Sequence, residues 1–327
     1  MGISMSPCRR ATQSLGVLAL VTSLGLATAG SAAARPVPDP SSSIRVTSVT
    51  GTVVRKAVST RNTIYFGAAG DVDALSAVSG ETVSRHSYGN FQGSVPTGRM
   101  ITVNASGIPW TSVTDAVPGT PMYTNIVRWA QTIKARPDRI LLSFGHEPEV
   151  VKKAGLGTAA EYRAAYQHVV SIFRQQGVTN VTWVFQATAW AFRVDPASAG
   201  SAATWYPGDA YVDVVGGDAY NWNTCGLPGQ GKDVPLSTIA GGILAFAKAH
   251  GKKASLPEFA ATSSPGRAAW LTNGYAWLKS NSSYFVASYY FNRPPTNPDN
   301  ADCVWWLNTP AEYASYTAIV KDTWTVQ

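Results

Sequence analysis

An alternation of short apolar runs with longer amphipathic stretches, starting near residue 63, most strongly limits what this chain can fold into. The short runs have the length of strands. Several of them are apolar without a two-residue alternation, as parallel strands covered on both faces usually are. The longer stretches between them have helical spacing. The predicted strands are residues 64–68, 82–86, 100–104, 140–144, 181–186, 212–216, 253–256 and 285–291.

Helix signals are clearest in the second half of the chain. The segment from Thr158 to Glu161 is a capping box, and the apolar residues after it lie on one helical face until Gly177. A second capping box, from Thr309 to Glu312, carries proline at the first helical position. Further helices are expected over residues 236–250 and 265–280.

Eight strands alternating with helices over residues 63–325 predict an α/β fold, a single (β/α)8 TIM barrel, which typically needs about 250 residues. The link between the second and third strands, near residues 93–98, is too short for a full helix, so that unit is expected to be degenerate. An open doubly wound sheet is the competing architecture, and it favours a glycine-rich phosphate loop after the first strand. Residues 66–70 do not supply one.

The first 34 residues have the composition of an export signal. Arg9 and Arg10 precede an uncharged, mostly apolar run over residues 15–26, and small residues up to Ala34 offer a cleavage site. The run is short for a membrane span, although a retained N-terminal anchor is the alternative. We therefore expect a signal peptide (1–34), a linker (35–60) and a barrel domain (61–327) in a secreted, extracellular protein without membrane contact after cleavage.

Net charge and aromatic content limit the kinds of partner that this protein is expected to bind. The formal net charge of +7 is spread thinly, without the Lys/Arg cluster that a nucleic-acid partner requires. The 11 Trp and 14 Tyr instead suit aromatic surfaces that bind neutral sugars.

Because Cys8 lies in the expected signal, Cys225 and Cys303 remain as a candidate disulfide of an exported protein. Two buried thiols are the alternative.

Two glutamates stand at the carboxyl ends of predicted strands. Glu147 follows the strand at 140–144, and Glu258 follows the strand at 253–256. In a barrel both would reach the mouth where active sites form. Glycosidic bond cleavage uses such a pair: one carboxyl group protonates the leaving oxygen, and the other attacks the anomeric carbon or activates water. Glu149 is an alternative acid.

Three segments of the chain resemble glycoside hydrolase family 26, the β-mannanases and their relatives in a retaining barrel clan. The segments are residues 145–148, 205–216 and 256–259. The resemblance runs from about Thr63 to the C-terminus. It implies that Glu147 is the general acid/base, with His146 beside it, and that Glu258 is the nucleophile. It also implies that Tyr220 donates a hydrogen bond to the nucleophile.

The chain departs from the family pattern at two places. Pro148 and Glu149 follow the acid/base position, where the family's mannanases usually have methionine and asparagine. Ser143 stands where an arginine is common. Both places are expected to lie near the substrate, so the departures leave the preference for mannan open.

Aromatic and polar residues near the predicted strand ends are candidates for substrate binding, because flat rings stack on sugars. Trp129, Trp270 and Trp277 fall in helical stretches and are expected in the core. Trp110 is another aromatic residue near a strand end. Besides His146 and Tyr220, the substrate-binding candidates are Trp190, Trp222, Trp305, Trp306, His86 and Gln186.

Together these features predict a secreted, retaining endo-β-glycanase that hydrolyses a β-linked polysaccharide or oligosaccharide, with β-1,4-mannan as the first candidate. The alternatives are a catalytically inactive carbohydrate-binding barrel and the same chemistry on β-glucan or xylan. An esterase is disfavoured because no Gly-x-Ser-x-Gly motif is present. No cofactor and no catalytic metal are expected, since the four histidines are not suitably paired. The protein is expected to be a monomer.

Overall fold

The computed structural model describes residues 63–104, 107–225, 231–293 and 303–327. Within them, eight parallel strands form a closed barrel in which each strand pairs with its neighbours in the sequence and β1 pairs with both β2 and β8. The predicted single-domain (β/α)8 barrel is therefore confirmed. The predicted signal and linker (1–34 and 35–60) lie outside the described residues.

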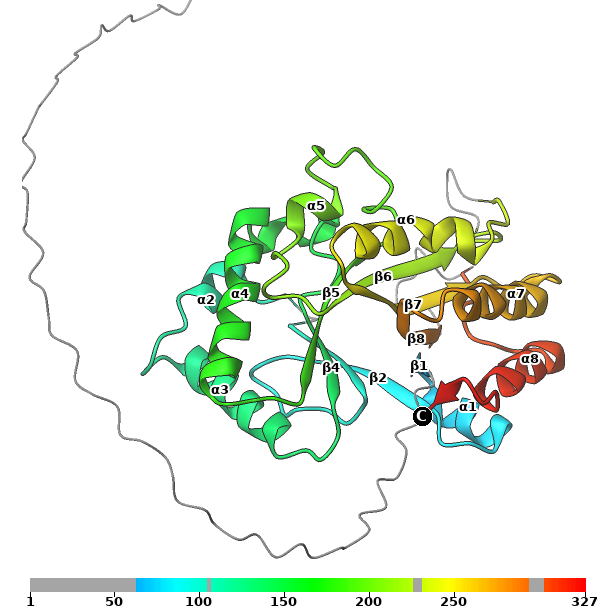
Figure 1. Cartoon of the computed structure of the whole chain (residues 1–327), viewed down its shortest axis with the longest axis horizontal. Helices are drawn as coiled ribbons and strands as arrows, with labels where there is room; N and C mark the ends of the chain where they lie inside the picture. Colours follow the sequence, from blue (N-terminus) through cyan, green and yellow to red (C-terminus); the bar gives the residue numbers. More distant parts are fainter. Residues whose placement is uncertain (1–62, 105–106, 226–230, 294–302) are drawn as a thin grey trace, which may run out of the picture. The chain divides into compact units, whose positions relative to one another are not determined.

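The bounds of the elements follow the chain order (Figure 1). The strands are β1 (Ile64–Gly70), β2 (Ser84–Gly89), β3 (Met100–Val103), β4 (Ile140–Phe144), β5 (Val181–Thr188), β6 (Val214–Asn221), β7 (Lys253–Ala261), β8 (Phe285–Asn292) and β9 (Thr325–Val326). The helices are α1 (Val72–Ser79), α2 (Trp110–Thr114), α3 (Pro121–Lys134), a 3-10 turn (Val151–Leu156), α4 (Ala159–Gln175), α5 (Ala202–Trp205), α6 (Leu236–Ala249), α7 (Arg267–Ser280) and α8 (Pro310–Val320).

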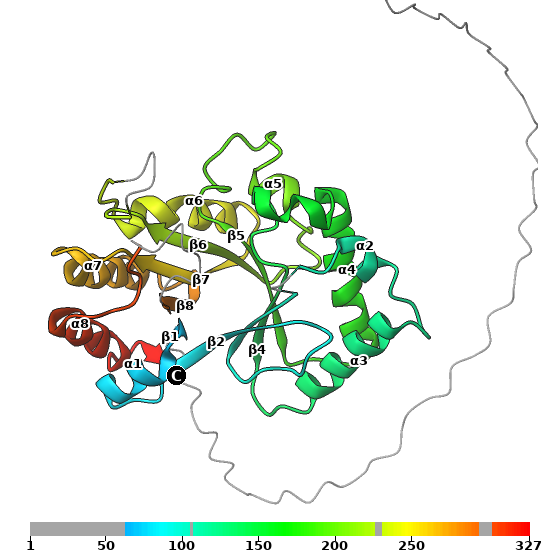
Figure 2. The same cartoon turned by 180° about the vertical axis from the view of Figure 1, so that it is seen from behind.

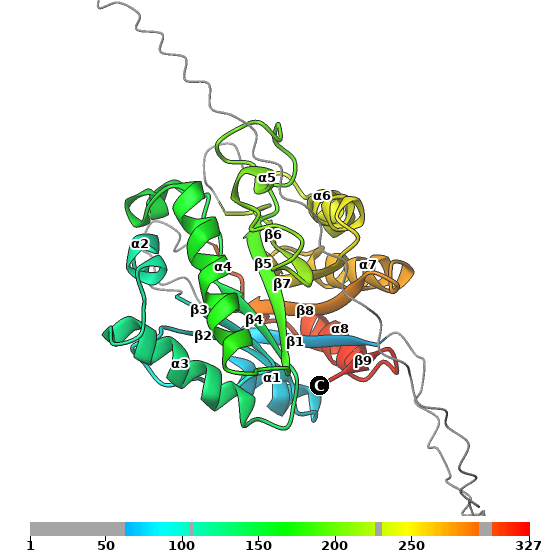
Figure 3. The ribbon, with the colours of Figure 1, turned by 60° about the vertical axis from the view of Figure 1, so that its left-hand side comes forward.

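The helices surround the barrel. In Figures 1 and 2, α6, α7, α8 and α1 follow one another along one side, and α2, α3 and α4 cover the other. Figure 3 shows α4 next to β5. The described link between β2 and β3 contains no helix, as predicted. The strand β9, which the sequence analysis did not predict, pairs with the start of β1.

The observed strand bounds agree with the apolar runs of the sequence for β4 but not for the ends of β6 and β7. β4 has the predicted bounds, residues 140–144. β6 and β7 each run five residues beyond their predicted ends. The added residues include Asp218, Tyr220 and Glu258, because a strand whose last residues face the barrel mouth carries polar side chains there. An apolar pattern therefore ends before the strand does.

Both predicted capping boxes are present. In α4, the Thr158 side chain accepts from the Glu161 amide, and the Glu161 carboxylate accepts from the Thr158 amide. Thr309 and Glu312 make the same exchange at the start of α8. These side chains satisfy amide groups that the first turn of a helix leaves without partners.

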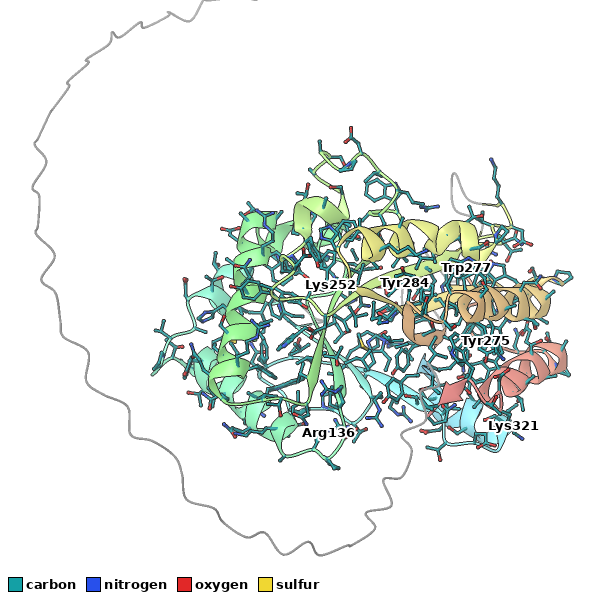
Figure 4. All side chains as sticks on the ribbon, viewed as in Figure 1. Arg136, Lys252, Tyr275, Trp277, Tyr284 and Lys321 are labelled. Atoms are coloured by element: carbon teal, nitrogen blue, oxygen red, sulfur yellow. A yellow bond between two sulfur atoms is a disulfide. The ribbon has the colours of Figure 1, made fainter. Side chains whose placement is uncertain are left out.

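Two apolar clusters hold the barrel together, one between strands and helices and one inside the barrel. The predicted core residues Trp129 and Trp270 are buried in the outer cluster. Trp277 of α7 (Figure 4) packs against it, with its ring 5.2 Å from that of Phe285. Trp110 is also fully buried, so it belongs to the core rather than to a sugar-binding surface.

A buried ion pair joins the start of α7 to the first turn of α8. Arg267, at the start of α7, donates from Nε and Nη2 to the two carboxylate oxygens of Glu312, each at 2.7 Å. Arg267 also donates to the carbonyl oxygens of Val304 and Trp306. A disulfide joins Cys225 to Cys303, with a Cα–Cα distance of 4.5 Å, as predicted.

Candidate active site

Glu147 lies just past β4 on a turn that is unusual for residues with side chains. Gly145 has φ of 58° and Glu147 has φ of 46°, both in the left-handed region. For Glu147 this conformation costs on the order of 1 kcal/mol. Its amide donates to the carbonyl oxygen of Gln186 at 2.8 Å, which fixes the turn against β5. Strain of this kind is typical of functional positions.

Glu258 lies inside β7 rather than after it, which corrects the sequence analysis. The β7 pairing shifts register between Leu256 and Phe259 on the β8 side, and β6 shifts between Gly216 and Ala219. Pro257 has no amide hydrogen to contribute to a ladder, so the break falls where a proline is tolerated. The irregularity aims the Glu258 side chain into the barrel mouth, and only 7% of the residue is exposed.

Two tyrosines hold the carboxyl group of Glu258. The Tyr220 hydroxyl donates to Oε2 at 2.5 Å, as the sequence analysis predicted for Tyr220. The Tyr88 hydroxyl donates to Oε1 at 2.7 Å, and Tyr88 was missed. Each oxygen of Glu258 therefore has its own phenolic donor, which fixes the orientation of the carboxyl group.

Burial and a neighbouring charge act on the pKa of Glu258. Burial raises this pKa above its ordinary value of 4.5, and the charge on Glu147 raises it further. The hydrogen bonds from Tyr220 and Tyr88 and the charge on Lys153 lower it. The two glutamates are thus close enough to influence each other. Their expected separation of about 5–5.5 Å stays a prediction.

A cleft of about 470 Å³ opens beside Glu147, and Tyr220, which bonds to Glu258, also lines it. Trp190 lies on its wall with 54% of its surface exposed, the arrangement of a ring that stacks on a sugar. Trp222 is half-buried in the same wall. The described residues that line the cleft are Glu147, Val150, Thr188, Ala189, Trp190, Arg193, Asp218, Tyr220, Asn221, Trp222, Lys232, Val234 and Ile239.

Two of the predicted aromatic residues have other roles in the packing. Trp305 is buried, and its ring lies edge-on to those of Tyr220 and Trp222, at 4.9 Å from each. It therefore supports these rings from behind rather than presenting a face to a sugar. The carbonyl oxygen of Trp306 accepts from Arg267, and neither tryptophan is among the described residues that line this cleft.

His146 lies next to Glu147 and half-buried, with its ring 5.9 Å from that of Tyr88. Its carbonyl oxygen accepts from the Lys153 ammonium group. Lys153, another missed residue, thereby stands near the pair of glutamates, where its charge favours the ionised form of Glu258.

His86 and Gln186 lie below the cleft, since both are buried. His86 bonds to Thr102, Thr102 bonds to Gln186, and Gln186 bonds to Asp218. These two predicted residues thus belong to a polar layer under the glutamates. A direct contact with substrate, as the sequence analysis expected, does not fit this burial.

Asp218 and Tyr88 are the main residues that the sequence analysis missed. Each stands two residues from a predicted one, Asp218 before Tyr220 and Tyr88 after His86. Residues two apart on a strand point to the same face, so this spacing was a usable signal. Burial raises the pKa of Asp218 well above its ordinary value, and the charges on Glu258 and Glu147 raise it further.

The residues that depart from the family pattern, Ser143, Pro148 and Glu149, are not among the described residues that line the cleft. Ser143 is fully buried within β4, so it cannot touch a substrate in this arrangement, contrary to the expectation. Glu149 accepts from the Thr188 amide at 2.7 Å, and burial raises its pKa to about 7. Glu149 is not among the described cleft residues.

The described part of the chain contains no group of three or more His, Cys, Asp or Glu residues that could hold a metal ion. No helix in this part is both long enough and apolar enough to cross a bilayer.

Comparison with known proteins gives one family and one curated relative. The model of glycosyl hydrolase family 26 matches residues 151–260, about a third of the chain, including Glu258. Endoglucanase H of Acetivibrio thermocellus is 29% identical over 223 residues, which is 64% of this chain and 23% of that protein. The chain therefore spans about a quarter of the length of this relative.

Solved structures share the fold. A family 26 β-mannanase from Bacteroides ovatus superposes with a TM-score of 0.53 at 15% identity, covering 81% of this chain and 90% of that one. A modular endo-β-1,4-mannanase from Cellulomonas fimi gives 0.53 at 19% identity, over 81% and 72%. The catalytic domain of a family 26 endo-β-1,4-mannanase from Bacillus sp. JAMB-750 gives 0.54 at 16%, over 81% and 87%.

The strand order defines the class of fold, a (β/α)8 barrel. The family that the chain resembles is glycosyl hydrolase family 26, whose model matches about a third of the chain. The resemblance inferred from the sequence motifs is thereby confirmed.

Proposed function

We propose that the protein is a retaining endo-β-glycanase in which Glu258 is the nucleophile and Glu147 the general acid/base. The observation that carries the proposal is the setting of Glu258: two phenolic donors fix its oxygens, and the charge on Glu147 acts on it across the site. Trp190 and Trp222 offer aromatic surface in the cleft that Glu147 lines.

The chemistry follows from these positions. Glu258 attacks the anomeric carbon while Glu147 donates its proton to the leaving oxygen, so the glycosidic bond breaks and a covalent glycosyl-enzyme forms. Glu147, now a carboxylate, removes a proton from water, which releases the sugar and regenerates Glu258. Tyr220 and Tyr88 keep the attacking oxygens oriented between the two steps.

The first candidate substrate is β-1,4-mannan. Its support is the number of β-mannanases among the structural relatives, whereas the curated relative is called an endoglucanase. Incubation of the purified protein with mannan, xylan and mixed-linkage β-glucan, with reducing ends counted over time, discriminates between these substrates. Greater release from mannan is expected, and greater release from another glycan would change the substrate but not the mechanism.

The residue assignment is tested with matched variants. Glu258→Gln keeps the shape of the side chain and removes the nucleophile, so turnover is expected to fall by several orders of magnitude. Glu149→Gln is the control, since Glu149 is the competing acid, and it is expected to retain most of the activity. Binding of mannan without turnover by the unmodified protein would favour the inactive carbohydrate-binding alternative.

We also propose export, with a signal peptide over residues 1–34, cleavage near Ala34, a linker over 35–60 and a monomeric catalytic domain over 61–327. The supports are the signal-like composition and the Cys225–Cys303 disulfide, which suits an oxidising compartment. N-terminal sequencing of the protein recovered from culture medium tests the cleavage site, and light scattering tests the monomer.

A further inference from the structure

The backbone conformation of Glu147 is unusual for its residue type. Among the described residues, only two residues other than glycine have a positive φ, and they are Asn104 and Glu147. Asparagine is common in this left-handed region because its short polar side chain can bond to the nearby backbone, whereas glutamate is not. The surroundings of Glu147 must therefore favour the left-handed conformation over an extended one.

The hydrogen bonds between the Glu147 turn and β5 show what an extended conformation would change. In a regular parallel ladder, a residue donates its amide to one partner residue and accepts, through its carbonyl oxygen, from the amide two residues further along. Glu147 makes the first of these bonds, to the Gln186 carbonyl oxygen at 2.8 Å. The second bond would come from the Thr188 amide. The Glu147 carbonyl oxygen instead accepts from the Val150 amide at 3.4 Å.

The side chain of Glu149 takes the place of that carbonyl oxygen. Glu149 Oε1 accepts from the Thr188 amide at 2.7 Å. Pro148, which is buried between the two glutamates, has its φ fixed by the ring, so it restricts how Glu147 and Glu149 are oriented to each other. A side chain thus continues the ladder with β5 at the point where the left-handed backbone of Glu147 interrupts it.

Thr188 also begins the turn that carries Trp190. The Ala191 amide donates to the Thr188 carbonyl oxygen at 3.0 Å, which closes this turn. Thr188 and the exposed Trp190 both line the cleft. The contact between Glu149 and Thr188 therefore joins the turn of the acid/base residue to the aromatic wall of the cleft.

We propose that Glu149 is a positioning residue: its carboxyl group replaces the Glu147 carbonyl oxygen in the ladder with β5, and this holds the Glu147 side chain at the barrel mouth. The inference rests on the proposed function in one respect, because it takes Glu147 as the general acid/base. The role needs an oxygen acceptor at the end of a side chain of this length. Glutamine can fill it and alanine cannot, whereas a glutamine could not replace Glu149 as a proton donor.

The first test measures the hydrogen exchange of single backbone amides by NMR and needs no activity. The Thr188 amide is expected to be protected in the unmodified protein and in Glu149→Gln. In Glu149→Ala it is expected to exchange about 10-fold faster or more, because its acceptor is lost. Asp213→Ala is the matched control, since Asp213 Oδ2 accepts from the Trp183 amide at 2.8 Å near the other end of β5. This variant is expected to leave the protection of Thr188 unchanged.

Two results of the exchange measurement would overturn the proposal. One is a Thr188 amide that is unprotected in the unmodified protein, and the other is equal protection of this amide in Glu149→Ala. The first result requires no variant, so the test decides even where Glu149→Ala does not fold.

The second test asks whether Glu149 acts through the proton donor. It compares kcat/KM for aryl glycosides that have the same sugar and differ in the leaving group. Glu149→Ala is expected to lose about 10-fold or more with a poor leaving group, and much less with an activated one, which needs little proton donation. A smaller amount of folded protein would reduce both values by the same factor. Glu149→Gln and Asp213→Ala are expected to resemble the unmodified protein with both substrates.

The outcomes separate this proposal from the proposed function. Equal losses with both leaving groups in Glu149→Ala, or full activity with both, would overturn the positioning role and leave the glycanase assignment intact. A Glu149→Gln variant as impaired as Glu149→Ala would overturn it too, and a loss confined to poor leaving groups would then make Glu149 itself the acid. If the unmodified protein cleaves no glycan, the proposed function fails, and the exchange measurement still decides whether Glu149 holds the Glu147 turn.

Discussion

At the scale of single residues, the surroundings of Glu258 have opposing effects on the pKa of its carboxyl group. Burial and Glu147 favour the protonated form of Glu258, whereas Tyr220, Tyr88 and Lys153 favour the ionised form that attacks. The sequence motifs were sufficient to predict Glu258 and the hydrogen bond from Tyr220. They could not predict the donor Tyr88 or the burial of His86, because strand spacing gives the face of a residue but not its depth in the barrel.

Tyr220→Phe is expected to move the acidic limb of the activity profile to higher pH, because a hydrogen bond that stabilises the ionised form of Glu258 is lost. A hydrogen bond to a charged group contributes about 1.5–3 kcal/mol, which corresponds to roughly a 10- to 100-fold loss of kcat/KM. Tyr290→Phe is the control, since it removes a buried hydroxyl that donates to the Trp305 carbonyl oxygen instead. An unmoved limb in Tyr220→Phe would contradict this role.

Glu258→Gln is expected to make the fold more stable at neutral pH while it abolishes turnover. The pKa of Glu258 is higher in the folded state than the ordinary 4.5, so the folded state binds more protons above that pH. The free energy of unfolding of the unmodified protein therefore falls as pH rises from about 4.5 through the raised pKa.

Thermal unfolding at several pH values measures this effect. The Tm of Glu258→Gln should exceed that of the unmodified protein above the raised pKa, and the two should converge at low pH. A Tm difference that grows as the pH falls would contradict a raised pKa of Glu258 in the folded state.

At the scale of elements, the start of α7 is joined to α8 by a buried contact that no local pattern reveals. The strand rhythm predicted all eight barrel strands, and β4 had the predicted bounds. The ends of β6 and β7 were not predictable, because their last residues are polar and a register shift interrupts both pairings. Likewise, Arg267 and Glu312 are 45 residues apart, so their pairing arises only when α7 and α8 pack.

Arg267→Met is expected to destabilise the fold by about 3–5 kcal/mol, because it leaves the Glu312 carboxylate buried without its cation. Lys279→Met is the matched control: it breaks the exposed pair with Asp322, and the expected loss is under about 1 kcal/mol. Urea unfolding of both variants measures the difference. Equal losses would contradict a larger stabilising effect of the buried pair between α7 and α8.

At the scale of the whole molecule, the barrel was predictable because one sequence pattern repeats along the described domain. Most repeats combine an apolar run of strand length with a helical stretch. The pairing of Cys225 with Cys303 was predictable for a different reason, since only these two cysteines remain outside the expected signal. The polar layer beneath Glu258 was not predictable, because it joins side chains from β2, β3, β5 and β6 that meet only when the barrel closes.

Removal of the disulfide is expected to destabilise the whole domain. The disulfide closes a loop with a sequence separation of 78 residues. The chain-entropy model therefore gives a decrease of roughly 4 kcal/mol in the free energy of unfolding when both cysteines are replaced by serine. Chemical unfolding of the double variant, with and without reductant, measures the loss. Thiol titration of the unfolded, unreduced protein is the control, and two free thiols in the mature chain would contradict the bridge.

The measurement that tests the central claim most directly is the trapping of the glycosyl-enzyme. A fluorinated, activated β-mannobioside slows the second step more than the first, so a retaining enzyme accumulates the covalent intermediate. Mass spectrometry of a digest is predicted to find the sugar on Glu258, and Glu147→Ala is expected to be labelled as well, because an activated leaving group needs little proton donation. A sugar attached to Glu149 or to another residue, or release of product with inverted configuration and no adduct, would contradict the account.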